Sequence, residues 1–420
     1  MRGAILTIGR EILLGTIVDT NSAFLSKELC SVGVEVVKII SVSDENWAIE
    51  EALVDALKVA DLVVTTGGLG PTSDDITKKT IAGVLGRKLV LREDILEGVR
   101  RMFEDRGIEM PQINVSQGMV IDGAEVFPNP VGTAPGMLVR EAGRIIVMLP
   151  GVPVEMKSLW KSMKPVLVRE VENRGGKQLV FTTIHTTDLP ESVIAERIEA
   201  EFPEVVPHLA YLPSYRGVSL RVMMGGENAQ KQVRSYVDSL RRMFGDYVWG
   251  EDEDTLEEVV GRLLRERRWK IAVAESCTGG LIGGAFTRVP GSSDYFWGGV
   301  ISYANDVKEN VLGVSREVLN QHGAVSAECA RAMAIGVRKL LGVDLGVSAT
   351  GIAGPGGGTT EKPVGLVYIG LASEDDAFAF RFLFRGDRHK VREQTVYKAL
   401  SIVRWYLATG RFPDTLPLCE

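Results

Sequence analysis

The chain has 420 residues, of which 45% are hydrophobic and 25% are charged, and its formal net charge at pH 7 is -7. A single hydrophobic core usually stops growing at about 250–300 residues, so this length predicts two or three folded domains. The composition excludes wholesale disorder, and the negative net charge excludes a broad basic field for non-specific nucleic-acid binding.

Cysteine content and apolar runs bear on the compartment of the protein. The four cysteines lie far apart: Cys30, Cys277, Cys329 and Cys419. They include no C-x-x-C pair, so we expect neither a zinc site nor a disulfide framework. Residues 1–3 lead directly into a strand-like run, and no apolar run has the length of a membrane span. We therefore expect a soluble cytoplasmic protein that has no contact with a membrane.

The first part of the chain alternates strand-like and helix-like segments. Residues 4–8, 34–40 and 62–66 form apolar, strand-like runs, whereas residues 21–32 and 48–60 have helical spacing. Such alternation predicts an α/β domain with a mainly parallel sheet covered by helices. Ligands are then expected at the carboxyl ends of the strands.

A polar turn over residues 65–77 follows one of these strands directly. Gly67, Gly68 and Gly70 would let backbone amides approach a phosphate closely. Asp74 and Asp75 supply the hard oxygen ligands that a magnesium-like ion held against a diphosphate requires. A tight turn followed by a capped helix is the alternative explanation of the same pattern.

Three further segments place polar residues beside predicted strands. Residues 8–21 add glycines and carboxylates after the first strand, and residues 129–136 and 149–155 are rich in glycine and proline. Thr133 and Glu155 are candidates to line the same cleft as the turn over residues 65–77. Plain turns are the alternative for these segments.

Five ordered motifs in this region resemble the molybdenum-cofactor-biosynthesis-type domain of the CinA family, which is named for competence and damage-inducible proteins. The motifs are Gly9-x-Glu11-Ile12-Leu13-x-Gly15, Asp19-x-Asn21, Thr66-Gly67-Gly68-Leu69-Gly70-Pro71-Thr72-x-Asp74-Asp75, Asn129-Pro130-x-Gly132-x-Ala134-Pro135-Gly136 and Leu149-Pro150-Gly151-Val152-Pro153. Arg10 departs from the family pattern, in which a small or acidic residue is common at this position.

The resemblance implies that residues 1–165 form a metal-dependent ADP-ribose pyrophosphatase, which yields AMP and ribose 5-phosphate. It implies a divalent metal ion, Mg²⁺ or similar, with the ligands Glu11, Asp74 and Asp75. It also implies that the substrate is bound by Asn21, Thr66, Gly67, Gly68 and Gly70. Binding of a pterin-type nucleotide, as in the molybdenum-cofactor relatives, is the alternative.

Residues 166–250 are predicted to form a small α+β connector domain. The basic residues Lys231, Arg241 and Arg242 lie on its last predicted helix. No glycine-rich loop or aromatic platform accompanies them, so we expect a solvated helix face and no direct contact with nucleic acid.

Residues 251–420 are predicted to form a C-terminal α/β domain that begins with a helix capped by Thr255. Within it, residues 270–280 read Lys-Ile-Ala-Val-Ala-Glu-Ser-Cys-Thr-Gly-Gly, which predicts a buried strand that leads into a turn. We expect residues 278–280 to open a helix whose free N–H groups point toward Ser276 and stabilise negative charge. Ser276 is therefore a candidate nucleophile, and a helix-capping serine is the alternative.

Candidate partners for Ser276 follow the next strand-like run. Lys308 is our candidate base, because burial among apolar groups lowers the pKa of a lysine and favours the neutral amine. Tyr303 could relay the proton or orient either partner. An alternative nucleophile is Cys277, with His322 as its base.

Two later segments are candidates for substrate binding. Residues 348–359 form a glycine-rich loop that includes Thr350, Gly351 and Gly354, and no Gly-Lys-Ser or Gly-Lys-Thr ending makes it a nucleotide P-loop. Arg388 lies among several cations at the start of the last predicted helix and could bind a phosphate. A flexible loop and an exposed basic turn are the alternatives.

The C-terminal motifs together resemble the CinA C-terminal domain, which is similar to nicotinamide mononucleotide deamidase. They are Ala274-Glu275-Ser276-Cys277-Thr278-Gly279-Gly280, Gly298-Gly299-Val300-x-x-Tyr303, Lys308, Ala349-Thr350-Gly351-Ile352-Ala353-Gly354-Pro355 and Gly386-Asp387-Arg388. The resemblance implies hydrolysis of nicotinamide mononucleotide to nicotinate mononucleotide and ammonia, without a cofactor. Ser276 would be the nucleophile, assisted by Lys308 and Tyr303.

The resemblance also implies a substrate-binding set: Thr278, Gly279, Gly280, Thr350, Gly351, Gly354 and Arg388. We further expect a homodimer that acts on small nucleotides in pyridine-nucleotide salvage. A non-catalytic scaffold linked to DNA uptake is the alternative from a different class, and the negative net charge does not support it.

Overall fold

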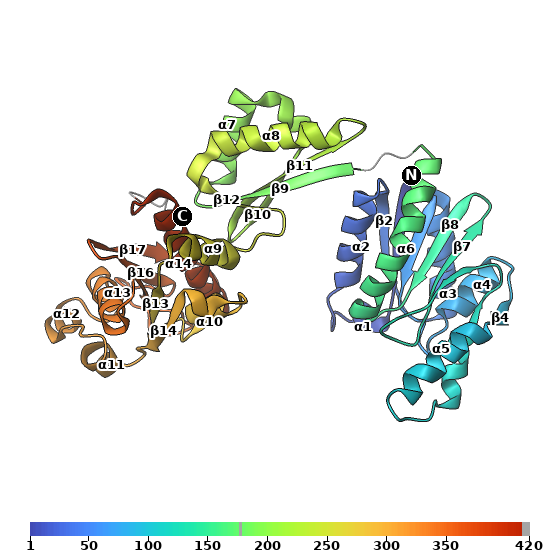
Figure 1. Cartoon of the computed structure of the whole chain (residues 1–420), viewed down its shortest axis with the longest axis horizontal. Helices are drawn as coiled ribbons and strands as arrows, with labels where there is room; N and C mark the ends of the chain where they lie inside the picture. Colours follow the sequence, from blue (N-terminus) through green and yellow to red (C-terminus); the bar gives the residue numbers. More distant parts are fainter. Residues whose placement is uncertain (176–178, 414–420) are drawn as a thin grey trace. The chain divides into compact units, whose positions relative to one another are not determined.

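The computed structural model describes residues 1–175 and 179–413 (Figure 1). The chain divides into two compact units, one comprising Met1–Val180 with Met224–Gln230 and the other Phe181–Met223 with Lys231–Glu420. Among the described residues, no helix combines the length and the apolar character needed to cross a membrane.

The first unit contains a six-stranded sheet with the strand order β2-β1-β3-β8-β7-β6 (Figure 1). Its strands are β1 (Arg2–Ile8), β2 (Glu35–Val42), β3 (Leu62–Thr66), β6 (Glu125–Phe127), β7 (Gly136–Glu141) and β8 (Arg144–Leu149). The pairs among β2, β1, β3 and β8 are parallel, and β7 and β6 extend the sheet in antiparallel pairing. The mainly parallel α/β sheet predicted for this region is confirmed.

Helices cover both faces of this sheet, because successive strand side chains point to opposite sides. On β1, Ala4 and Leu6 pack in one core with α3 and α4, whereas Ile5 packs in another core with α2 and α6. The helices are α1 (Arg10–Leu13), α2 (Thr20–Ser31), α3 (Asn46–Val59), α4 (Thr77–Val84), α5 (Glu93–Glu104) and α6 (Pro153–Asn173). Helix α6 continues through the domain boundary expected at residue 165.

Smaller elements complete the first unit. Strands β4 (Leu89–Leu91) and β5 (Met119–Ile121) pair antiparallel in a separate sheet, and a 3-10 helix spans Gln112–Gly118.

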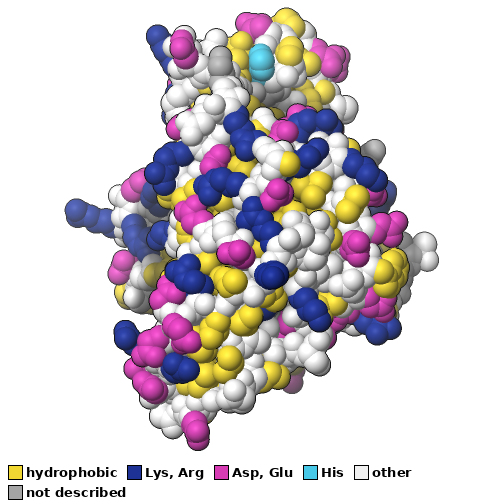
Figure 2. All heavy atoms as spheres, turned by 90° about the vertical axis from the view of Figure 1, so that its right-hand side faces the viewer, with side chains coloured by type: hydrophobic (Ala, Val, Ile, Leu, Met, Phe, Trp, Pro, Cys, Tyr) yellow, Lys and Arg dark blue, Asp and Glu magenta, His cyan; other side chains and the backbone are white. Residues whose placement is uncertain are grey.

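Figure 2 shows Lys and Arg side chains interspersed with Asp, Glu and hydrophobic side chains on the face that it presents. That face therefore carries no continuous basic surface of the kind that binds nucleic acid.

The second unit begins with a four-stranded sheet in the order β10-β11-β9-β12. Its elements are β9 (Leu179–Thr186), α7 (Glu191–Glu201), β10 (Leu209–Ser214), β11 (Gly217–Gly225), α8 (Ala229–Phe244) and β12 (Val248–Glu251), with 3-10 helices at Pro203–His208 and Gly245–Tyr247. Arg234 and Arg241 of α8 form ion pairs with Glu251 at 3.0 and 2.5 Å. Part of the basic helix face is therefore neutralised within the connector.

The rest of the second unit contains a five-stranded sheet in the order β14-β13-β15-β16-β17 (Figure 1). Its strands are β13 (Ile271–Glu275), β14 (Phe296–Ile301), β15 (Leu345–Gly351), β16 (Leu366–Ala372) and β17 (Ala377–Leu383). Strands β14, β13 and β15 pair parallel, and β16 and β17 pair antiparallel. Its helices are α9 (Leu256–Arg267), α10 (Leu281–Thr287), α11 (Asn305–Asn310), α12 (Arg316–Gln321), α13 (Ala327–Leu341) and α14 (Arg388–Thr409), with a 3-10 turn at Ser292–Asp294.

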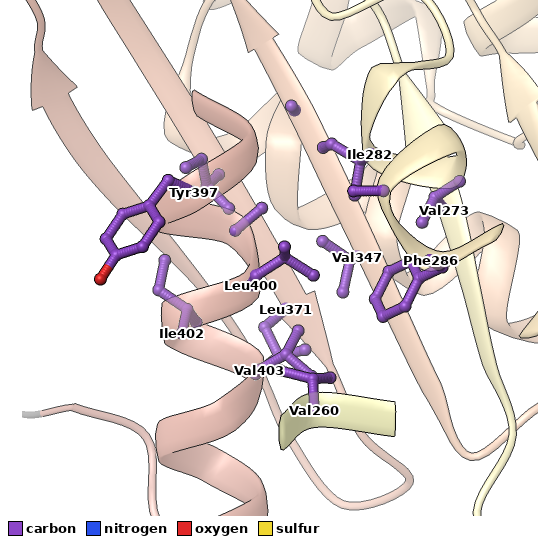
Figure 3. Close-up of a cluster of buried hydrophobic side chains, with 14 of the residues drawn as sticks. Val260, Val273, Ile282, Phe286, Val347, Leu371, Tyr397, Leu400, Ile402 and Val403 are labelled. Carbon is purple, nitrogen blue, oxygen red and sulfur yellow. The ribbon is translucent and has the colours of Figure 1, made fainter. Parts of the chain in front are cut away.

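This sheet also has helices on both faces. Figure 3 shows Leu400 and Val403 of α14 packed with Val347 and Leu371 of the sheet, in a core that α9 and α10 share. Helix α13 packs in a separate core with the alternate residues of β13. Thr255 caps α9 in a capping box with Glu258, which confirms the predicted start of that helix.

Candidate active sites

Ser276 lies at the carboxyl end of β13, between the two neighbouring parallel strands. Its N–H donates to the Ala349 carbonyl of β15 at 2.9 Å, which extends the strand pairing by one residue beyond Glu275. The side chain is partly exposed, so a ligand at this edge of the sheet can reach it. The local geometry presents the serine hydroxyl where parallel α/β sheets usually bind their ligands.

Lys308 of α11 lies against this serine. Its Nζ is 3.3 Å from Ser276 Oγ and donates to the carbonyls of Ser302 and Tyr303 at 2.6 and 3.2 Å. The side chain is 1% exposed, and burial lowers its pKa from the usual value. A neutral amine has two hydrogens and one lone pair, so it can satisfy both carbonyls and still accept the serine proton.

Tyr303 is placed differently from the predicted relay. Its carbonyl contacts Lys308, whereas its hydroxyl receives a hydrogen bond from Arg388 Nη2 at 3.3 Å. The side chain is 62% exposed, so the phenol faces the open side of the site. This position suits contact with a substrate better than proton transfer between Lys308 and Ser276.

The prediction that residues 278–280 open a helix with free N–H groups is wrong. Helix α10 begins at Leu281, and the amides of Gly280, Ile282 and Gly283 donate to the carboxylate of Glu275 at 2.9, 3.1 and 2.8 Å. Glu275 is 1% exposed and occupies the positive end of the helix, so this end cannot hold a substrate anion.

The turn between Ser276 and α10 nevertheless offers two other amides. Among the described residues, no backbone oxygen accepts a hydrogen bond from the Cys277 or Thr278 N–H, and both amides lie near the Cys277 thiol. Gly279 and Gly280 have φ values of 59° and 98°, which favour glycine, and they turn the chain into α10. The amide that directly follows a nucleophile is a recurrent donor to an oxyanion, so Cys277 N–H is the leading candidate.

The alternative Cys277–His322 pair has no geometric support. Burial raises the pKa of the Cys277 thiol to about 11, which disfavours the thiolate. His322 follows α12 and lies 3.7 Å from the carboxylate of Glu328, with its side chain 42% exposed. Among the described residues, no hydrogen bond joins Cys277 to His322.

The glycine-rich loop meets the site through Arg388. The Gly354 carbonyl accepts from Arg388 Nη1 at 3.0 Å, so one guanidinium connects this loop to Tyr303. Thr350 donates to the Ala324 carbonyl at 2.7 Å and is 1% exposed, so its hydroxyl is engaged inside the protein. A Cβ at Gly351 would lie 2.7 Å from the Leu366 carbonyl, which identifies close strand packing as the reason for glycine there.

In the first unit, a cavity of 510 Å³ lies at the carboxyl ends of β1, β3 and β8. Thr133 and Glu155 line it as predicted. So do most of the residues predicted to bind the substrate or the metal: Glu11, Asn21, Gly67, Gly68, Gly70 and Asp75. Thr66 does not line it, but its hydroxyl accepts from Asn21 Nδ2 at 3.0 Å and donates to the Pro150 carbonyl at 3.0 Å. The predicted cleft therefore exists, with Thr66 supporting Asn21 from behind.

Sequence reasoning left Asn129 without a role. Its Nδ2 donates to Glu155 at 2.7 Å, and its Oδ1 accepts from the amides of Val131 and Gly132 at 3.1 Å each. It thereby fixes the Pro/Gly turn against the start of α6. Burial raises the pKa of Glu155, whose carboxylate Asn129 contacts.

Two of the three predicted metal ligands lie in the same cleft. Glu11 and Asp75 line the cleft, whereas Asp74 is exposed and does not. Asp75 Oδ2 accepts from both the amide and the hydroxyl of Thr72, at 2.9 and 2.5 Å. Within residues 1–175 and 179–413, no three His, Cys, Asp or Glu side chains form a ready metal site. Two carboxylates fit Mg²⁺ only where substrate phosphates supply further ligands.

Family models match three consecutive parts of the chain. "Probable molybdopterin binding domain" matches residues 4–169, "Damage-inducible protein CinA KH domain" matches residues 182–250, and "CinA C-terminal domain" matches residues 253–407. KH modules clamp RNA with a G-x-x-G loop, and residues 182–250 contain no such sequence. The absence of direct nucleic-acid binding stays a prediction.

Curated relatives match over almost the whole chain. A "Putative competence-damage inducible protein" of Desulforudis audaxviator is 43% identical over 411 residues, which cover 97% of this chain and 99% of the relative. A "CinA-like protein" of Chloroherpeton thalassium is 43% identical over 418 residues, which cover 96% and 99%. The crystal structure of the protein CinA from Thermoplasma acidophilum is 36% identical and covers 40% of this chain and 97% of its own, with a TM-score of 0.37. The chain therefore belongs to the CinA family.

Proposed function

We propose that the second unit is an amidohydrolase that converts nicotinamide mononucleotide and water to nicotinate mononucleotide and ammonia. The observation that carries this proposal is the 3.3 Å contact between Lys308 Nζ and Ser276 Oγ at one edge of the sheet. A serine beside a buried lysine can act as a nucleophile without histidine. The family resemblance supplies the substrate.

The reaction uses Lys308 as the proton carrier. Ser276 Oγ gives its proton to the neutral Lys308 Nζ and forms a bond to the carboxamide carbon, so that the carbonyl electrons move to the oxygen. As this oxyanion collapses, the carbon–nitrogen bond breaks and Lys308 returns the proton to the departing nitrogen, which leaves as ammonia. Lys308 then takes a proton from water, whose oxygen attacks the acyl carbon, and the serine oxygen leaves with that proton.

The surrounding residues orient the nucleotide. The Cys277 and Thr278 amides, which donate to no backbone oxygen, are the candidate donors to the oxyanion. Arg388 is the candidate holder of the phosphate, since its guanidinium already connects the glycine-rich loop and Tyr303. The exposed phenol of Tyr303 is placed to contact the ribose or the pyridine ring.

The test is ammonia release from nicotinamide mononucleotide, with nicotinamide riboside as the substrate that lacks the phosphate. Arg388→Gln is expected to raise the KM for the nucleotide about 10–100-fold, in the range lost with one charged contact, and to raise the KM for the riboside much less. Wild-type protein that releases no ammonia contradicts the proposal and favours the non-catalytic scaffold linked to competence or DNA damage.

We also propose that the first unit hydrolyses ADP-ribose to AMP and ribose 5-phosphate. Its support is the 510 Å³ cavity, which the Gly67–Gly70 turn and the carboxylates of Glu11 and Asp75 line. A divalent ion held by these carboxylates and the substrate would neutralise the charge of the diphosphate. The glycines leave the backbone open to the phosphates, and Asn21 is positioned to contact the substrate.

Release of AMP from ADP-ribose tests this second activity, with Mg²⁺ in one series and a chelator in the other. Metal-dependent AMP release supports it. Failure to release AMP under both conditions contradicts it, and tight binding of a pterin-type nucleotide in the same cleft would then establish the alternative.

We further propose that the protein is a homodimer. Leu13, Leu14 and Val18 are 54, 69 and 80% exposed, and contiguous exposed apolar residues commonly mark a protein interface. Light scattering should give twice the chain mass of 45.7 kDa. The mass of a single chain at micromolar concentration would contradict the proposal.

A further inference from the structure

A second cavity of 170 Å³ lies within the second unit, away from Ser276. The turn between β10 and β11 forms one wall, and α9, α10 and α14 form the others. Its lining residues are Tyr215, Arg216, Glu257, Leu281, Arg288, His389, Arg392, Glu393, Val396, Tyr397 and Leu400. The proposed catalytic mechanism uses none of them.

Charge in this cavity is unequally paired. Glu257 lies 3.5 Å from Arg288, and Glu393 lies 3.4 Å from His389. The remaining two cations, Arg216 and Arg392, form no ion pair with a described residue. The lining thus contains three arginines and two glutamates, so its guanidinium groups outnumber its carboxylates.

Arg216 and Arg392 approach the cavity from different elements. Arg216 is exposed on the turn after β10, where its Nε donates to the Tyr215 hydroxyl at 3.1 Å. Arg392 lies on α14, and its Nε is buried with no hydrogen-bond partner. The two guanidinium groups therefore reach the cavity from the connector turn and from the last helix.

Tyr397 and Leu400 supply the apolar side of the cavity. Figure 3 shows the Tyr397 ring at the margin of the hydrophobic core, with its hydroxyl directed away from the other labelled side chains. One wall of the cavity is thus rigid core, and the opposite wall is a turn of the connector. A ligand bound between them would contact both parts of the second unit.

Arg392 also reaches the catalytic turn. Its Nη2 donates to the Thr278 carbonyl at 2.7 Å, two residues beyond Ser276. Leu281, the first residue of α10, lines the cavity as well. The guanidinium that would bind an anion therefore already holds the backbone that positions the nucleophile.

We propose that this cavity is an effector site for a small phosphomonoester, and that its occupancy adjusts the Ser276 turn through Arg392. Two guanidinium groups suit a dianion with several acceptor oxygens. The cavity is smaller than the 300–1,000 Å³ usual for larger ligands, so it excludes a dinucleotide and fits a phosphate with a short polyol or sugar fragment. The binding is independent of the proposed deamidase activity, whereas the coupling rests on it.

Binding is tested by calorimetry on the full chain, with glycerol 3-phosphate as the probe and glycerol as the uncharged comparator. Wild type and Ser276→Ala should both bind the phosphoester and not glycerol. Arg216→Gln should weaken binding at least 10-fold, and Arg216→Lys, which keeps the charge without the planar fork, should weaken it less. Arg262→Gln, at an exposed arginine of α9 outside the cavity lining, is the matched control and should bind as wild type.

The results separate this site from the two proposed active sites. No binding by wild type, or equal binding by Arg216→Gln and Arg262→Gln, overturns the effector site, since binding elsewhere would not depend on Arg216. The coupling predicts that glycerol 3-phosphate changes kcat or KM for nicotinamide mononucleotide at least twofold in wild type but not in Arg216→Gln. Unchanged kinetics in a deamidase that binds the phosphoester refutes the coupling, and a protein without deamidase activity refutes only the proposed function.

Discussion

Replacement of Lys308 by methionine removes the proposed proton carrier while it keeps an unbranched side chain of similar length. The amine contacts Ser276 Oγ at 3.3 Å and donates to two carbonyls, and the side chain is 1% exposed. Loss of a general base typically costs 10²–10⁴-fold in rate, so kcat should fall by about 10³-fold, or about 4 kcal/mol in the barrier.

Stability should change by less than activity in this variant. Methionine leaves the Ser302 and Tyr303 carbonyls without their donor, at about 1–3 kcal/mol each, but it also ends the burial of an amine. We therefore expect a net loss of about 2 kcal/mol, or about 4–8 °C in the melting temperature of a domain of this size.

The assay is single-turnover ammonia release together with thermal unfolding of the same preparation. Lys308→Arg is the matched control, because its guanidinium keeps hydrogen-bond donors near both carbonyls but cannot become neutral. It should be as inactive as the methionine variant. Activity within tenfold of wild type in either variant would refute the role of Lys308 as base.

Three further predictions concern the pH dependence, the catalytic turn and the nucleotide cleft. Because the reaction needs neutral Lys308 and burial lowers its pKa, kcat/KM should rise with pH and level off above a midpoint below 10.5; a rate that falls from pH 7 to pH 9 would be inconsistent with a lysine base. Glu275→Gln should lower stability by about 1–3 kcal/mol, because an uncharged amide replaces the carboxylate that accepts from the amides of Gly280, Ile282 and Gly283 at the start of α10, and a melting temperature equal to that of wild type would exclude this capping role. Asp75→Asn should reduce AMP release from ADP-ribose at least 10-fold, whereas Asp74→Asn, at the neighbouring residue outside the cleft, should change AMP release by no more than about twofold. Equal effects of the two substitutions would contradict the role of Asp75 in holding the metal ion.

Sequence reasoning located both sheets and the strand ends that carry the sites. Buried apolar runs such as β3 and β13 are recognisable without a structure, and parallel strands place their carboxyl ends at one edge. From this rule alone, Ser276 and Lys308 are expected to lie near each other, although they are 32 residues apart in the chain. It does not give their distance, which depends on how α11 packs.

Sequence alone does not distinguish neighbouring residues of the same chemistry that the local backbone directs differently. Asp74 and Asp75 are adjacent and equally acidic, but only Asp75 lines the cleft, since the turn directs it toward Thr72 and Gly70. Glu275 ends the predicted strand, and a glutamate just before a glycine turn is a possible cap for the next helix. The effector cavity combines a connector turn with α14, and no local pattern predicts that packing.

The most direct test of the central claim is ammonia release from nicotinamide mononucleotide by wild type, Ser276→Ala and Cys277→Ala. Ser276 and Cys277 are adjacent residues of one turn, so each variant is the structural control for the other. Wild type and Cys277→Ala should release ammonia at comparable rates, and Ser276→Ala should fall by about 10³-fold or more, as expected for loss of a nucleophile. Retained activity in Ser276→Ala, or loss of activity only in Cys277→Ala, would contradict the claim that Ser276 is the nucleophile.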